Sequence, residues 1–116
     1  MNPASPDLLA KWRPLLEPVL LGGLSACGWD DALAMHPELT ERGESVLMTV
    51  DGQDDARTRT VLAAAGHTPD VLALVAESEE RARQRGMTRM AYVGRAGWQR
   101  AARDYKVVAV IGLKEL

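Results

Sequence analysis

The segment from Thr68 to Trp98 constrains the fold of this chain more than any other part of the sequence. Thr68 is a favourable N-cap, Pro69 suits the first helical position, and Gly86 suits the C-cap. These signals predict one long helix over residues 68–85, packed through a single apolar face. The residues that repeat at helical spacing along this face are Val71, Leu72, Leu74, Val75, Ala76 and Ala82.

Charged residues support the same helix. Asp70 lies in its predicted first turn and arginines lie in its last turns, an arrangement that matches the helix dipole. Glu79 and Arg83 are four residues apart, in the favourable order for an ion pair along a helix. Glu79 and Glu80 are therefore expected to be solvent-exposed.

The chain beyond this helix is predicted to return twice to a sheet. Residues 89–93 have the pattern of a strand, residues 94–98 form a turn punctuated by glycine, and residues 98–105 suggest a second helix. Residues 107–113 are a nearly unbroken apolar run, which is typical of a strand covered on both faces.

The first half predicts two helices followed by two strands. Helical spacing of apolar residues favours a first helix capped by Asp7, which Pro14 and Pro18 should kink or split. Arg57 and Arg59 lie on the same side of the second strand, so one of its faces is expected to begin strongly basic. The predicted elements are helices over 7–22 and 29–35 and strands over 45–50 and 57–64.

The resulting order is α, α, β, β, α, β, α, β. The two late strands are each preceded by a helix, which predicts an α/β fold (mixed α+β) with a mixed sheet and helices on both faces. A length of 116 residues predicts one domain, residues 1–116, with a flexible start at residues 1–6.

Charge is distributed unevenly along the chain. The first 55 residues hold three basic and ten acidic side chains, a net charge of −7, and the remainder holds eleven basic and six acidic ones, a net charge of +5. This split predicts docking of one half on the other, or self-association or protein binding through a basic C-terminal surface. The alternative is a set of solvated helix faces. The absence of a run of basic residues argues against a nucleic-acid partner.

Several other classes of site are not predicted. Cys27 is the only cysteine, so the chain can form no intramolecular disulfide and no cysteine-based metal cluster. His36 and His67 lie far apart with no carboxylate at ligand spacing, so no metal site is expected. The apolar run at residues 19–21 is too short for a signal peptide or a membrane span, which predicts a cytoplasmic or otherwise intracellular protein without a membrane partner.

Residues 71–114 resemble the C-terminal half of the GNAT (N-acetyltransferase) superfamily. The resemblance rests on the long helix that ends at Gly86, the strand Met90–Val93, the turn Gly94-Arg95-Ala96-Gly97-Trp98 and the closing strand. Small GNAT-like proteins encoded among the structural genes of tailed phages are similar in the same glycine-rich turn. The resemblance implies a shortened GNAT-like sheet.

The resemblance also implies where a cofactor would bind. Active members hold the pyrophosphate of acetyl-CoA on an Arg/Gln-x-x-Gly-x-Gly/Ala loop at the start of the central helix, where backbone N–H groups cradle the anion. The corresponding stretch here is Ala63–Thr68, in which only Gly66 matches the pattern. Ala63 replaces Arg or Gln, and Thr68 replaces the second small residue. The candidate cofactor-binding residues are Gly66, His67, Thr68 and Arg95.

Two of these residues have alternative roles. His67 is either a base in a cleft or a solvated loop histidine, and Arg95 holds either an anion, such as a CoA phosphate, or an internal partner such as Asp104. No catalytic residue is assigned.

The incomplete loop predicts a catalytically degenerate GNAT-like protein that serves as a structural or interaction component. The resemblance implies a phage virion as its setting. No cofactor is then expected. The alternative is a small N-acyltransferase that uses acetyl-CoA through a divergent loop.

Overall fold

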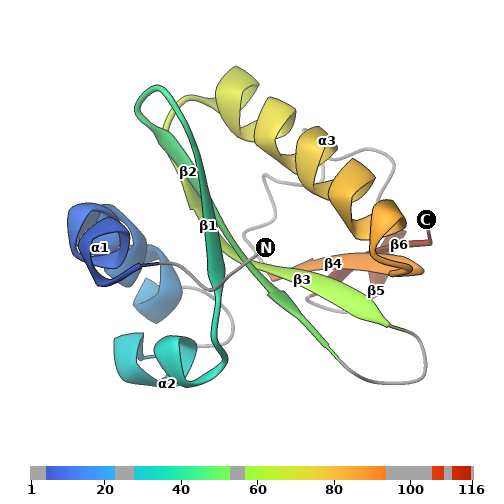
Figure 1. Ribbon diagram of the computed structural model, residues 1–116, viewed down its shortest axis with the longest axis horizontal. Helices are drawn as coiled ribbons and strands as arrows, with labels where there is room; N and C mark the ends of the chain where they lie inside the picture. Colours follow the sequence, from blue (N-terminus) through green and yellow to red (C-terminus); the bar gives the residue numbers. More distant parts are fainter. Residues whose placement is uncertain (1–4, 23–27, 53–56, 94–105, 109–110, 116) are drawn as a thin grey trace.

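The computed structural model describes residues 5–22, 28–52, 57–93, 106–108 and 111–115 (Figure 1). Within these ranges the chain forms helices and strands that alternate in a mixed pattern. In chain order they are α1 (Pro6–Gly22), α2 (Trp29–Ala34), β1 (Glu38–Arg42), β2 (Ser45–Asp51), β3 (Thr58–Ala65), α3 (Thr68–Gln84), β4 (Arg89–Val93), β5 (Lys106–Val108) and β6 (Ile111–Glu115).

β1 to β4 form a mixed sheet, which β6 and β5 extend in the order β1-β2-β3-β4-β6-β5. Neighbouring strands are antiparallel except β3 and β4, which are parallel and are connected through α3. α1 and α2 cover one face of the sheet and α3 covers the other (Figure 1). The predicted class, a mixed α/β fold with helices on both faces, is therefore confirmed.

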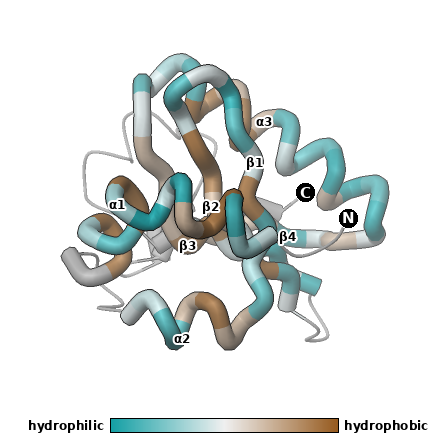
Figure 2. Tube along the Cα trace, turned by 60° about the vertical axis from the view of Figure 1, so that its left-hand side comes forward, coloured by the Kyte–Doolittle hydropathy of each residue, from teal (hydrophilic) through white to brown (hydrophobic). Residues whose placement is uncertain are grey.

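The face under α1 and α2 holds the larger hydrophobic cluster. Two tryptophans supply much of its volume, in a chain that has no phenylalanine. Figure 2 shows the apolar positions of α1 turned toward β2 and β3. The buried members are Trp12, Leu16, Leu20, Trp29, Ala32, Leu39, Val46, Met48 and Ala63.

The face under α3 holds a second cluster of Leu47, Val61, Leu74, Ala82, Met87 and Met90. Val71 is buried on α3 as well, so the predicted apolar face is largely correct. Ala76 was expected on that face but is exposed, because its position on the helix points away from the sheet.

A β-bulge in β3 determines which side chains reach each cluster. Met48 pairs with Ala63 whereas Thr49 pairs with Val61, so Leu62 is an extra residue on β3. Side chains alternate along a strand, and one extra residue reverses that alternation. Ala63 therefore joins the cluster under α1, while Val61, two positions earlier, joins the cluster under α3.

β1 was not predicted from the sequence. Its five residues include a single apolar side chain, Leu39, which lies in the cluster under α1. β1 and β2 are joined by the two-residue turn Gly43-Glu44, and Gly43 has a φ of 60°, as primed hairpin turns require. β1 forms because it pairs with β2. Its mostly polar sequence gives little indication of a strand.

α1 differs from its prediction at its cap, and of the two effects expected of its prolines, splitting does not occur. The Ser5 hydroxyl accepts a hydrogen bond from the Leu8 N–H at 3.3 Å, so Ser5 caps the helix in place of Asp7. The helix also continues through Pro14 and Pro18 without splitting. Both prolines are exposed, so water can solvate the carbonyl groups that lose their helical partners.

α3 is confirmed, with a start shifted by one cap position. His67 is the N-cap, and Thr68 is the first helical residue. At the other end Gly86 has a φ of 79°; its N–H bonds to the Arg83 carbonyl, and the Met87 N–H bonds to the Ala82 carbonyl at 2.9 Å. These two bonds form a Schellman motif, which explains why the helix ends before Gly86.

The C-terminal part of the prediction contained one strand and one helix. The single strand predicted over residues 107–113 is wrong, because β5 and β6 are two antiparallel strands. The helix predicted over residues 98–105 lies outside the described residues. Within the described part of the chain, no helix has the length and apolar character needed to cross a membrane.

Candidate functional site

Gly66, His67 and Thr68 lie at the junction where β3 ends and α3 begins. Gly66 has a φ of 122°, and a Cβ at this position would lie within 2.5 Å of the Ser45 Cα. The junction is therefore packed directly against the first residue of β2, and only glycine fits there.

The backbone of His67 is fully used inside the protein. Its N–H donates to the Ser45 hydroxyl at 3.0 Å, and its carbonyl accepts from the Val71 N–H at 2.9 Å. The imidazole itself is exposed. His67 thus acts through its backbone in this junction, in line with the solvated-loop interpretation of its side chain.

The start of α3 offers few groups to an anion. Pro69 has no N–H, and Asp70 places a carboxylate in the first turn. The Arg42 Nε lies 3.5 Å from the Asp70 carboxylate, and the Arg42 Nη1 donates to Glu77 at 3.3 Å. Arg42, which reaches the first turn of α3, is therefore engaged with two acids of that helix.

The remaining sequence candidates are distributed elsewhere. Arg95 and the turn around it lie outside the described residues, as does Cys27. His36 is exposed with a φ of 55° and lies between α2 and β1. Among the described residues no group of three or more His, Cys, Asp or Glu side chains is arranged to hold a metal ion.

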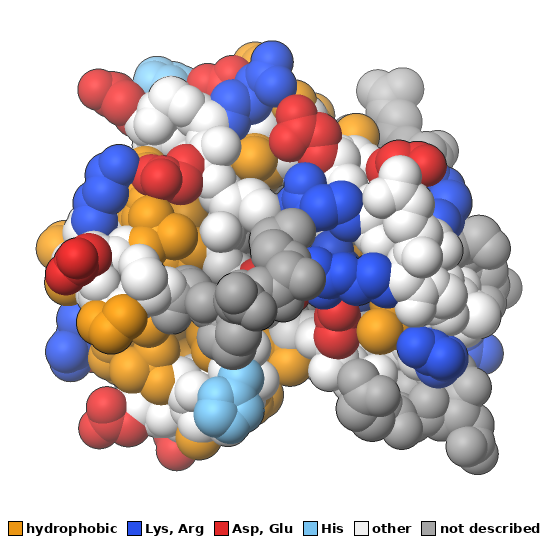
Figure 3. All heavy atoms as spheres, viewed as in Figure 1, with side chains coloured by type: hydrophobic (Ala, Val, Ile, Leu, Met, Phe, Trp, Pro, Cys, Tyr) orange, Lys and Arg blue, Asp and Glu red, His pale blue; other side chains and the backbone are white. Residues whose placement is uncertain are grey.

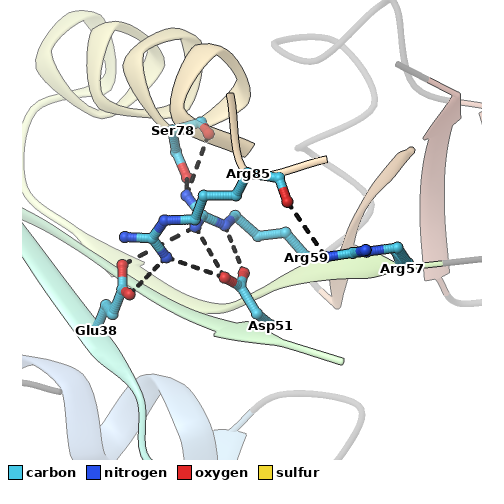
Figure 4. A network of polar contacts seen from close by, with 6 residues as sticks. All are labelled: Glu38, Asp51, Arg57, Arg59, Ser78 and Arg85. Atoms are coloured by element: carbon cyan, nitrogen blue, oxygen red, sulfur yellow. Dashed lines mark hydrogen bonds and ion pairs between the residues drawn. The ribbon is translucent and has the colours of Figure 1, made fainter. Parts of the chain in front are cut away.

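A buried network of charged groups, not predicted from the sequence, centres on Arg59 (Figure 4). Its guanidinium binds Asp51 in two places, with Nε–Oδ1 at 2.6 Å and Nη2–Oδ2 at 3.0 Å. Nη1 donates to the carbonyl of Ser78 at 3.2 Å and to its hydroxyl at 3.1 Å. Arg59 is completely buried, so each of its three nitrogens has found a partner inside the protein.

Arg85, at the end of α3, completes the network from the other side. Its Nη1 donates to Glu38 at 2.7 Å and to Asp51 at 3.0 Å. The Glu38 Oε2 lies 4.0 Å from the Arg59 Nη2, and the Arg57 Nη2 donates to the Arg85 carbonyl at 3.2 Å. Two carboxylates and two buried or half-buried guanidiniums therefore join β1, β2, β3 and the end of α3.

The charges of the network support one another. Partial burial would by itself raise the pKa of Asp51, but hydrogen bonds and charge interactions with Arg59 and then Arg85 outweigh it. The pKa of this carboxyl therefore lies below its ordinary value. The hydrogen bond to Glu38 is the main cause of the raised pKa of Arg85. Both shifts favour the charged forms of Asp51 and Arg85.

Two sequence-based expectations about charge are wrong at this point. Arg59 was expected on a basic strand face, but it is buried beneath α3 and neutralised by Asp51. Glu79 was expected at the surface, but it is buried and lies 3.8 Å from Arg83. The predicted ion pair of Glu79 with Arg83 is nevertheless present.

The chemistry of the network indicates a structural role. Its carboxylates already accept hydrogen bonds from guanidiniums, so neither Asp51 nor Glu38 is placed as a free base. The sequence carried one usable signal: Arg59 lies on the same side of its strand as Val61, and an arginine buried there needs an acidic partner. Comparison of the chain with protein-family models, curated proteins and solved structures finds no match in any of the three.

Proposed function

We propose that this chain is a catalytically degenerate, GNAT-like interaction protein that works by binding other protein surfaces. The setting implied by the sequence resemblance is a tailed-phage virion. The proposal needs no acetyl-CoA and no catalytic group.

The observation that carries the proposal is the contact between Ser45 and the junction Gly66-His67. A phosphate cradle requires free backbone N–H groups at the start of a helix. Here the His67 N–H donates to Ser45, and Ser45 also occupies the space beside Gly66. The carboxylate of Asp70 would face a bound pyrophosphate across the first turn, which disfavours a second anion.

One observation favours the alternative, a small acyltransferase. β3 and β4 pair only from Thr58–Arg89 to Val61–Tyr92, so the second half of β3 has its described strand partner on the β2 side alone. This half of β3 leads into the junction at the carboxyl end of a parallel strand, where α/β proteins commonly bind ligands. An extended ligand has backbone groups available there within the described part of the chain.

Thermal unfolding in the presence of acetyl-CoA separates the two functions. A ligand that binds only the folded chain raises stability by about 2.7 kcal/mol at a hundredfold excess over its Kd. We expect the melting temperature to stay unchanged with acetyl-CoA, and also with inorganic pyrophosphate as a probe of the cradle alone. A saturable rise with acetyl-CoA would reject the proposal in favour of the acyltransferase.

A further inference from the structure

β1 is an outer strand of the sheet, with β2 as its strand partner among the described residues. Because Arg42 and Ser45 close a two-residue hairpin, they are a hydrogen-bonded pair, and such pairs recur at every second residue. The N–H and C=O groups of Leu39 and Glu41 therefore point away from β2. No hydrogen bond to these groups occurs within the described part of the chain.

The contact between this strand and α3 includes polar atoms that lack a hydrogen-bond partner among the described residues. Glu38 Oε2, Thr40 Oγ1 and Arg81 Nε are buried, and none forms a hydrogen bond within the described residues. Arg81 lies one helical turn from Glu77 and from Arg85, which both contact the β1–β2 hairpin, and Thr40 lies on the same side of β1 as Glu38. The chain itself covers these atoms, so the groups that a second strand can reach are the outward-pointing backbone groups of β1.

The outer strand is complementary to itself. Its residues are Glu38, Leu39, Thr40, Glu41 and Arg42. Placed antiparallel to a second copy about a two-fold axis at Thr40, the strand sets Glu38 of each copy opposite Arg42 of the other. Leu39 then exchanges backbone hydrogen bonds with Glu41 of the second copy, which uses the outward-pointing groups of both strands.

The side of α3 next to β1 has the same symmetry of charge. It begins with Asp70 and Glu77 and ends with Arg81 and Arg85. α3 covers β1 and β2, so the two-fold axis would bring two copies of α3 side by side and antiparallel, with the acidic half of each facing the basic half of the other. Figure 3 shows Lys and Arg side chains beside Asp and Glu side chains along this face.

We propose that β1 binds β1 of a second copy of this chain, so that two sheets join into one across the dimer. The occupant is a second copy because both the strand and the helix beside it are self-complementary in charge. This proposal deepens the interaction function proposed above and rests on it.

A cysteine at the two-fold axis tests the register directly. In a Cys27→Ser background, the Thr40→Cys substitution places two sulfurs on a non-hydrogen-bonded pair, whose Cα atoms lie roughly 4.5 Å apart and within the span of a disulfide. We expect this protein to form a covalent dimer under mild oxidation much faster than the control Glu44→Cys protein, which has its cysteine in the hairpin turn. Equal or slower cross-linking at position 40 would overturn the proposal.

Sedimentation of the full chain supplies the second measurement, with a matched pair of variants. Arg42 and Arg13 are both half-exposed and both bind glutamate, but only Arg42 lies at the proposed interface. We expect a concentration-dependent dimer whose Kd rises by about three- to tenfold in Arg42→Gln and changes little in Arg13→Gln. A monomer at every concentration, or equal effects of the two substitutions, would contradict the proposal.

The two proposals fail in different ways. A chain that binds no acetyl-CoA and stays monomeric removes the β1 dimer and leaves the interaction function to another surface. A chain that binds acetyl-CoA removes the interaction function whatever its oligomeric state.

Discussion

Arg59 shows how a single buried charge organises this fold. A guanidinium without water must have its nitrogens bonded within the protein, and Asp51 and Ser78 provide those bonds from β2 and α3. Burial of such a pair is weak evidence of stabilisation by itself, because desolvation opposes the attraction. The bonds of Arg59 instead determine position. Because Asp51 and Ser78 bind the same guanidinium, they fix the height of α3 above the sheet.

Removing Arg59 should therefore be costly. Arg59→Ala leaves Asp51 partly buried without its bidentate partner, and we expect a loss of about 3–5 kcal/mol in the free energy of unfolding. Urea denaturation measures this change. Arg13→Ala, which removes an exposed guanidinium that also binds a carboxylate, is the control and should have almost no effect. Similar losses in both variants would show that Arg59 is not buried as described.

Asp51 should make stability sensitive to acid. Its folded-state pKa lies below the value in the unfolded chain, so its contribution is fully present above about pH 4 and disappears as the pH falls through the folded-state value. We expect the free energy of unfolding to decline below pH 4, and to decline less steeply in Asp51→Asn. Parallel slopes for the two proteins would contradict the ion pairs drawn in Figure 4.

Among the helices and strands, those with local sequence signals could be predicted. α3 was predictable because Pro69, the apolar repeat and Gly86 all act within the helix itself. β1 was not, because its stability comes from pairing with β2 and one buried leucine. The Arg59 network was not predicted for a similar reason, because the partners of Arg59 come from separate elements. The face to which Arg59 points also depends on a β-bulge that no local sequence pattern predicts.

The packing of α3 gives a direct test at this scale. Leu74 is buried within the cluster under α3, and Leu74→Ala should cost about 2–5 kcal/mol through lost contacts and a residual cavity. Leu15→Ala on the exposed side of α1 is the control, because half of that side chain is already in water. Chemical denaturation of both variants measures the difference, and a neutral Leu74→Ala would mean that α3 does not pack through this side.

In the whole molecule, contacts inside the fold neutralise part of the charge difference between the two halves of the chain. The acidic Glu38 and Asp51 from the first half bind the basic Arg59 and Arg85 from the second half. Arg42 reverses the pattern by binding acids of α3. The basic surface expected from composition is thereby reduced, and the outer strand β1 becomes the more specific candidate for contact with another chain.

We infer that the β3–α3 junction, packed against Ser45, serves as a structural turn and does not act as a cofactor cradle. Backbone amide NMR of the chain during titration with acetyl-CoA tests it most directly, because it reports on the N–H groups that would hold pyrophosphate. We expect the amide signals of Gly66, His67 and Thr68 to stay in place, and the His67 amide, bonded to Ser45, to remain protected from hydrogen exchange. A saturable shift centred on these three residues would contradict it.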